Sequence, residues 1–302
     1  MCESMPNVKK KTRNFFTMKL KLLLALTVIF TASGAAISFS SGTGKAAMVT
    51  LSGTIQPSAS GSLYSGGGMT PENIREINNR IQNGNYEAVV YEINSGGGTV
   101  VASKEIMRDI EKMEVPTVCR FRDLAASGAY MISLGCDKIV ADPASMTGSI
   151  GVKSSYLEFS GALDEFGVEY VNITAGKNKD VGSPYRNATP EQKEILQEKA
   201  EKVHQQFLDL VRENRNISEG NFSDVRTGTI FLGTEAEEIG LVDSLGGREE
   251  AFNTAENLAG KNLSFSGVQR EQSLGLLSLL SADIFLGNFL GANQAPLKAS
   301  FY

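Results

Sequence analysis

The feature that most constrains the fold is an alternation of strand-like runs with helical patterns through the middle of the chain. Runs rich in Val, Ile and aromatic residues occupy positions 48–55, 88–93, 117–121, 138–141 and 168–173. Helical patterns begin at Thr70, span about 99–113, begin again at Ser127 and extend from about 189 to 215. Such alternation predicts an α/β fold with right-handed βαβ units on a mainly parallel sheet.

The N-terminus differs from the rest of the chain. Residues 1–21 form a basic segment, and residues 22–39 form an uncharged, mostly apolar run. About 18 residues at 1.5 Å each cover most of a hydrocarbon core of about 30 Å, so this run predicts a transmembrane anchor. The basic flank predicts a cytoplasmic N-terminus and places everything after Phe39 outside the cytoplasm. A cleaved signal sequence is the alternative, because small residues occupy positions 32–36.

After this segment the sequence predicts a short linker at 40–46, one globular domain at 47–262 and a hydrophobic C-terminal tail at 263–302. The net charge of −5, with charges well mixed, excludes the basic face that nucleic acid binding requires. Cys119 and Cys136 lie in apolar runs and are interpreted as buried free thiols, and Cys2 lies before the apolar segment. Because no Cys/His cluster has metal-ligand spacing, no metal site is predicted.

The stretch from Asp123 to Val152 carries the strongest chemical signal. Ser127 stands among small residues with Gly128 directly after it, which leaves room for a substrate backbone to approach a nucleophile. The one histidine of the chain, His204, lies in a long charged helical pattern and is interpreted as a partly exposed helical residue. A lysine is therefore the expected general base, as in Ser-Lys variants of the catalytic triad.

Several ordered motifs resemble the signal peptide peptidase A family of serine proteases, of the Clp protease/crotonase fold group. They are Ala-Ala-Ser-Gly-Ala-Tyr at 125–130, Ala-Asp-Pro-Ala-Ser-Met-Thr-Gly-Ser-Ile-Gly-Val at 141–152, Gly-Lys-Asn-Lys-Asp-Val-Gly-Ser-Pro-Tyr-Arg at 176–186, Phe-Leu-Gly-Thr-Glu-Ala at 231–236 and Gly-Leu-Val-Asp-Ser-Leu-Gly-Gly at 240–247. The resemblance runs from about 47 to 260. It implies stacked ββα units in a single copy.

The resemblance also implies roles for five residues. Ser127 would be the nucleophile, Lys179 the base, Ser149 the residue that orients the lysine, and Gly97 and Gly128 the oxyanion-hole donors. The residues alone fit an ordinary structural role as well as a catalytic one. In that interpretation Ser127 is a helix N-cap and Ser149 is a turn serine.

Two features of these motifs leave alternatives open. Lys177 competes with Lys179, because both lie on the same polar loop. The family has Ser-Pro-Gly-Gly where this chain has Ser-Gly-Gly-Gly at 95–98, and losing the proline loosens that loop.

The function implied is that of a membrane-anchored serine endopeptidase that hydrolyses hydrophobic peptides, such as signal-peptide remnants, without a cofactor. The resemblance further implies a ring-like homo-oligomer, in which the lysine comes from the same or an adjacent subunit. Two alternatives are a Clp-like membrane protease that cleaves the tail of a stomatin-type partner, and a catalytically inactive crotonase-like scaffold. The presence of both Ser127 and Lys179 argues against the scaffold.

Overall fold

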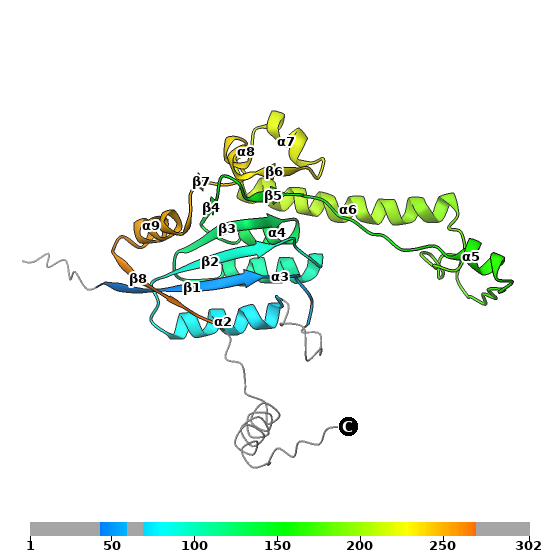
Figure 1. Ribbon diagram of the computed structural model, residues 1–302, viewed down its shortest axis with the longest axis horizontal. Helices are drawn as coiled ribbons and strands as arrows, with labels where there is room; N and C mark the ends of the chain where they lie inside the picture. The colour runs from blue at the N-terminus through cyan, green and yellow to red at the C-terminus, as the bar shows by residue number, and fades with distance from the viewer. Residues whose placement is uncertain (1–42, 59–68, 270–302) are drawn as a thin grey trace, which may run out of the picture. The chain divides into compact units, whose positions relative to one another are not determined.

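A mainly parallel sheet forms the centre of the fold in the computed structural model, which describes residues 43–58 and 69–269 (Figure 1). The strands are β1 (Gly44–Ser52), β2 (Ala88–Ser95), β3 (Thr117–Ala126), β4 (Lys138–Ala141), β5 (Met146–Gly148), β6 (Ile230–Leu232), β7 (Ser244–Leu245) and β8 (Leu263–Gly267). Their order is β6-β5-β3-β2-β1-β8, while β4 pairs with β3 and β7. All pairs are parallel except β5 with β6. The predicted α/β class with a mainly parallel sheet is confirmed.

The long strand β3 organises the sheet because two short strands share its free edge. Its first half pairs with β4 and its second half with β5, where Ala126 lies opposite Gly148. On its other side, β3 pairs with β2. β8 pairs with β1 in parallel, so the folded unit extends to Gly267, beyond the predicted boundary at 262.

Helices cover both faces of the sheet, as the nearly continuous burial of the central strand β2 requires. The helices are α2 (Pro71–Asn83), α3 (Val100–Glu111), α4 (Gly128–Ser133), α5 (Ser160–Glu165), α6 (Pro190–Asn214), α7 (Glu219–Val225), α8 (Gly233–Glu238) and α9 (Arg248–Ala259). On β2, Val89 and Tyr91 belong to the larger core with α2, α3 and α4, whereas Ala88 and Val90 belong to the smaller core with α9.

Local sequence explains where the predicted helices begin. Thr70 caps α2, because its Oγ1 accepts a hydrogen bond from the Asn73 N–H at 3.3 Å, and Pro71 occupies the first turn. The predicted apolar stripe of α2 is buried at Ile74, Ile77 and Ile81. Burying each such side chain contributes about 1.5–3 kcal/mol relative to exposing it. Hydrophobic burial therefore fixes which face of α2 lies on the sheet.

A buried carboxylate lies beneath α9. Glu92 of β2, whose side chain is 2% exposed, binds Arg120 and Arg248 at 2.9 Å each. Burial acts to raise the pKa of the Glu92 carboxyl, but the hydrogen bonds and charges of Arg248 and Arg120 outweigh it and hold that pKa below its ordinary value. The ion cluster thereby joins the N-terminus of α9 to the two central strands.

Two sequence-based interpretations are corrected by the structure. Cys119 and Cys136 form a disulfide instead of two free thiols, because pairing of β3 with β4 and the turn after α4 bring them together. Residues 168–173 form no strand, and Val168, Val171 and Ile173 are exposed. A β-branched run needs a partner strand, and none of the strands in the described residues pairs with this run.

The segment from 152 to 188, which includes α5, lies mostly on the surface. None of the residues of α5 is buried, and in α6 the buried residues are Gln192 near its start and Phe207, Leu208 and Val211 in its second half. Figure 1 shows α5 beside the N-terminal end of α6. The sheet therefore supports only the second half of α6.

The predicted basic segment, apolar anchor and most of the linker and C-terminal tail lie outside the described residues. Within residues 43–58 and 69–269, the structure contains no helix with the length and apolar character that a membrane crossing demands.

Candidate active site

Four chain segments meet at the carboxyl edge of the parallel sheet. Residues after β1, β2, β3 and β5 all leave the sheet there, because parallel strands end at the same edge. Ile55 after β1 joins the loop after β2, since its carbonyl accepts from the Thr99 N–H and its N–H donates to the Gly97 carbonyl, both at 3.0 Å. This edge carries four of the five predicted site residues.

Ser127 occupies the turn between β3 and α4. Its backbone has φ 55° and ψ −122°, and a non-glycine residue in such a conformation costs about 1–3 kcal/mol. The turn is held because the Ser127 N–H donates to the Gly148 carbonyl at 2.8 Å and the Met131 N–H donates to the Ser127 carbonyl at 3.0 Å. Strained strand-to-helix turns of this kind expose nucleophilic serines in other hydrolases.

The hydroxyl of Ser127 is not used as a helix cap. Ser127 holds the N-cap position of α4, but its side chain makes no capping hydrogen bond. Within the described part of the chain, no other partner of its Oγ is found either. The half-buried hydroxyl is therefore free for chemistry, which the ordinary N-cap interpretation does not explain.

Two backbone N–H groups lie beside this serine. A Cβ placed on Gly128 would be 3.1 Å from the Gly98 nitrogen, so the two glycine backbones are in close contact. In the described residues, neither the Gly98 nor the Gly128 N–H has a hydrogen-bond acceptor. Two free donors beside a nucleophile are the elements of an oxyanion hole.

The Gly97 N–H, which the family resemblance implies as an oxyanion-hole donor, already has an acceptor. The Gly97 N–H already donates to Ser95 Oγ at 3.0 Å, and Ser95 is itself held by the Gly53 carbonyl at 2.6 Å. Gly97 is buried, whereas Gly98 is exposed. The signal for this bond is local, because a serine two residues before an N–H commonly accepts a hydrogen bond from it. The free donor in this loop is Gly98.

Ser149 lies next to the Ser127 turn. It follows Gly148, whose carbonyl binds the Ser127 N–H, and its own N–H donates to the Thr229 carbonyl at 2.8 Å. Its backbone is also left-handed, with φ 49°. Position and backbone geometry therefore bring Ser149 to the same edge as Ser127.

Lys179 does not reach this edge within one chain. It is exposed, and its neighbour Asp180 is bound through its carbonyl to Arg186 at 2.9 Å. Arg186 in turn donates to Gln192 Oε1 at 3.0 Å, in the first turn of α6. Lys177 is exposed too, in an ion pair with Glu191 at 2.8 Å. Both lysines therefore lie near the start of α6.

The length of α6 separates that loop from the serine. His204 of α6 contacts the Ile150 carbonyl at 2.9 Å, one residue beyond Ser149. Twelve residues of helix separate Gln192 from His204, which corresponds to about 18 Å at 1.5 Å per residue. His204 contacts backbone, in agreement with its predicted role as an ordinary helical residue. The loop with Lys177 and Lys179 and the Ser127 turn therefore lie at different positions along α6.

The family model of Peptidase family S49 matches residues 109–262, which include the Ser127 turn, Ser149 and Lys179. The chain belongs to Peptidase family S49. Among its relatives, a Methanocaldococcus jannaschii protein named as a protease is 37% identical over 64% of this chain and 63% of its own length. A protein of Enterococcus faecium named as a signal peptide peptidase is 33% identical over 70% of this chain and 62% of its own. The family resemblance predicted from the sequence is confirmed.

The matched region is a different share of the length of each relative of this S49 chain. The matched region spans about three fifths of the two relatives above, and 35% of Protease 4 of Haemophilus influenzae, which is 32% identical over 71% of this chain. A solved structure of a membrane-bound stomatin-specific protease aligns with 76% of this chain and 100% of its own, with 13% identity and a TM-score of 0.48. These last values are too low to extend any property of that protein to this chain.

Proposed function

We propose that this S49 chain is a serine endopeptidase of the signal peptide peptidase A type, with Ser127 as nucleophile and Lys179 of a neighbouring copy as base. The observation that carries the proposal is the Ser127 turn: a strained serine with an uncommitted hydroxyl beside two free N–H groups. A scaffold would have no use for this combination, since the strain stabilises nothing.

The chemistry follows from this geometry. Ser127 Oγ attacks the peptide carbonyl carbon, and the developing oxyanion accepts hydrogen bonds from the Gly98 and Gly128 N–H groups. The neutral amine of Lys179 takes the serine proton and returns it to the leaving amine. Water activated by the same amine then hydrolyses the acyl-enzyme. Ser149 would orient that amine from the adjacent turn, and no metal or cofactor enters any step.

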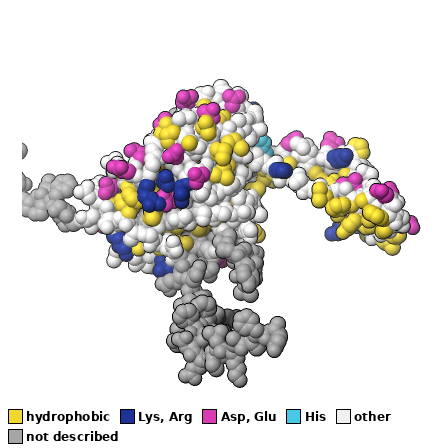
Figure 2. All heavy atoms as spheres, in the orientation of Figure 1, with side chains coloured by type: hydrophobic (Ala, Val, Ile, Leu, Met, Phe, Trp, Pro, Cys, Tyr) yellow, Lys and Arg dark blue, Asp and Glu magenta, His cyan; other side chains and the backbone are white. Residues whose placement is uncertain are grey.

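Sharing of the site between copies is supported by the position of Lys179 and by the surface around it. Large apolar side chains are exposed along this segment, among them Leu157, Phe166, Val171 and Ile173. Figure 2 shows such side chains gathered over the segment around α5. An apolar surface of this kind is costly in an isolated chain and marks an interaction site. A homo-oligomeric ring would cover it and bring the Lys179 loop to the next serine.

The sequence and the disulfide support the proposed location and substrate class. The basic segment 1–21 and the apolar run 22–39 would anchor the chain with its catalytic domain outside the cytoplasm. The Cys119–Cys136 disulfide fits a compartment outside the cytoplasm, where such bonds form. An enzyme at the membrane surface would meet hydrophobic peptides, such as signal-peptide remnants.

Labelling with a fluorophosphonate tests the nucleophile. The full chain should be labelled at Ser127 and should hydrolyse casein or a hydrophobic peptide, whereas Ser127→Ala should lose both while its thermal unfolding and assembly stay unchanged. Label on another serine, or hydrolysis by Ser127→Ala, would overturn the proposal.

A further inference from the structure

The disulfide encloses the segment that carries the proposed nucleophile. Cys119 lies on β3 and Cys136 lies just after α4, so the closed loop contains the second half of β3, the Ser127 turn and all of α4. Ser127 stands near the middle of this loop. A covalent bond at its base limits how far the turn and α4 can open together.

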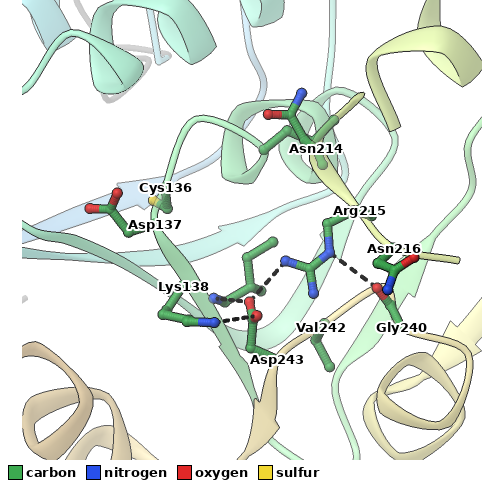
Figure 3. Close-up of a pocket in the computed structure, with 11 residues that line it drawn as sticks. Cys136, Asp137, Lys138, Asn214, Arg215, Asn216, Gly240, Val242 and Asp243 are labelled. Carbon is green, nitrogen blue, oxygen red and sulfur yellow. Dashed lines mark hydrogen bonds and ion pairs between the residues drawn. The ribbon is translucent and has the colours of Figure 1, made fainter. Parts of the chain in front are cut away.

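The two cysteines differ in access. Cys119 is 0% exposed in the larger core, whereas Cys136 is half-buried and lines a pocket of about 440 Å³. Figure 3 shows Cys136 at one side of this pocket, with Arg215 and Asp243 on the opposite wall. The volume falls in the range of small-molecule sites. A small molecule can therefore approach Cys136 and not Cys119.

The pocket is also stable when it is empty, because its polar wall is internally bonded. Asp243 binds Arg215 at 2.8 Å, Lys138 at 3.0 Å and the Ile139 N–H at 2.8 Å. Arg215 also donates to the Gly240 carbonyl at 3.1 Å. These bonds keep the wall in place without a ligand, so the space beside Cys136 stays open.

We propose that Cys136 is a thiol-exchange site, at which a small thiol entering this pocket opens the disulfide and loosens the Ser127 turn. The attacking thiol sulfur bonds to Cys136 Sγ, the Cys136–Cys119 bond breaks, and the proton of the attacking thiol passes to Cys119 Sγ. A second small thiol then attacks the mixed disulfide, which releases a small-molecule disulfide and leaves Cys136 as a thiol. Attack takes this direction because only Cys136 borders the pocket.

Reduction should loosen the turn without unfolding the domain. After reduction, hydrogen bonds of the Asp137 carboxylate still hold the base of the loop. This carboxylate accepts from the Thr117 N–H at 2.7 Å and from the Thr117 hydroxyl at 3.0 Å. Ser127, however, is held in a costly conformation that persists only while its surroundings over-determine it. Removing one constraint favours states in which α4 and the turn open locally. The effect on catalysis rests on the proposed function; the exchange chemistry does not.

Mapping of the mixed disulfide tests the site. The full chain carrying Cys2→Ser is treated under native conditions with glutathione, quenched with acid, alkylated and mapped by mass spectrometry. Glutathione should be found on Cys136 and the alkyl group on Cys119. Glutathione on Cys119, or reaction only after denaturation, would overturn the proposal.

Two matched variants test the route. In the same background, Asn214→Trp adds bulk at the pocket wall and should slow the exchange, whereas Asn257→Trp, on the exposed side of α9, should not. Equal rates in the two variants would show that the pocket is not the route.

Hydrogen exchange tests the consequence for the turn. After reduction, the amides of 128–133 should exchange about tenfold faster or more, and peptide hydrolysis should be lost at a lower temperature. The variant Cys119→Ala with Cys136→Ala should show the reduced behaviour with and without glutathione. Unchanged exchange at 128–133 would overturn the link to Ser127. If the oxidised protein exchanges thiols at Cys136 yet hydrolyses no peptide, the proposed function fails while the exchange site stands.

Discussion

Replacing Gly97 with alanine tests whether the loop after β2 must lie against the Ser127 turn. Gly97 has φ +94°, and a Cβ there would lie 2.6 Å from the Gly128 nitrogen and 2.9 Å from the Ala126 carbonyl oxygen. Both neighbours are backbone atoms, so neither can rotate away as a side chain would. The loop and the turn must therefore separate.

The size of the effect follows from these contacts. Left-handed strain costs about 1–3 kcal/mol, and forcing packed backbone apart costs a further 1–3 kcal/mol or so. We therefore expect Gly97→Ala to lower the free energy of unfolding by about 2–6 kcal/mol. Because the alanine methyl group would stand against the Gly128 N–H, at least one oxyanion donor is lost, and kcat should fall by about 10²–10³.

Gly96→Ala is the matched control, because a Cβ on Gly96 would meet only a Leu124 side-chain carbon at an ordinary 3.5 Å. Chemical unfolding and initial rates of peptide hydrolysis, measured on both variants, give the comparison. Gly96→Ala should remain close to wild type in both. If Gly97→Ala and Gly96→Ala behave alike, the proposed contact between the two backbones is refuted.

Two further predictions concern charged residues. Lys179→Ala should lose peptide hydrolysis about as completely as Ser127→Ala does, whereas Lys177→Ala should retain it. Steady-state rates of peptide hydrolysis measure this. Loss of activity in Lys177→Ala and not in Lys179→Ala would move the base to Lys177. Glu92 has a lowered pKa in the folded chain, so its stabilising contribution is present above about pH 4.5, its ordinary pKa, and is lost as pH falls through the folded value. Glu92→Gln should therefore lower stability by about 3 kcal/mol at neutral pH, because Arg120 and Arg248 lose their buried partner, and should flatten the acid decline. Unfolding midpoints between pH 3 and 7 measure this, and an unchanged acid limb would contradict it.

The sequence predicts what depends on local pattern. Alternating strand and helix signals indicated the parallel sheet, and Thr70 with Pro71 marked the start of α2, because capping and periodicity are properties of neighbouring residues. The small residues around Ser127 indicated the approach that a nucleophile needs. In the sheet and in α2 the local pattern and the final packing agree.

Other features depend on contacts that the sequence does not reveal. The Cys119–Cys136 bond forms because β3 and the turn after α4 become neighbours, which neither apolar run indicates. The pairing of β5 with β6 joins three-residue strands far apart in the chain, too short for a pattern to identify. The bond from the Gly97 N–H, which leaves the Gly98 N–H as the free one in this loop, depends on the direction in which Ser95 Oγ points. Tertiary geometry decides each of these.

Mixing two inactive variants tests the site shared between copies. Ser127→Ala and Lys179→Ala should each be inactive when assayed alone. The two variants are then mixed in equal amounts, unfolded together and reassembled. If Lys179 serves the serine of a neighbouring copy, random assembly places an intact serine beside an intact lysine in about one quarter of the sites, and about one quarter of wild-type activity should return. If both residues act within one chain, every site lacks one of them, and a mixture that assembles but stays inactive would contradict the proposal.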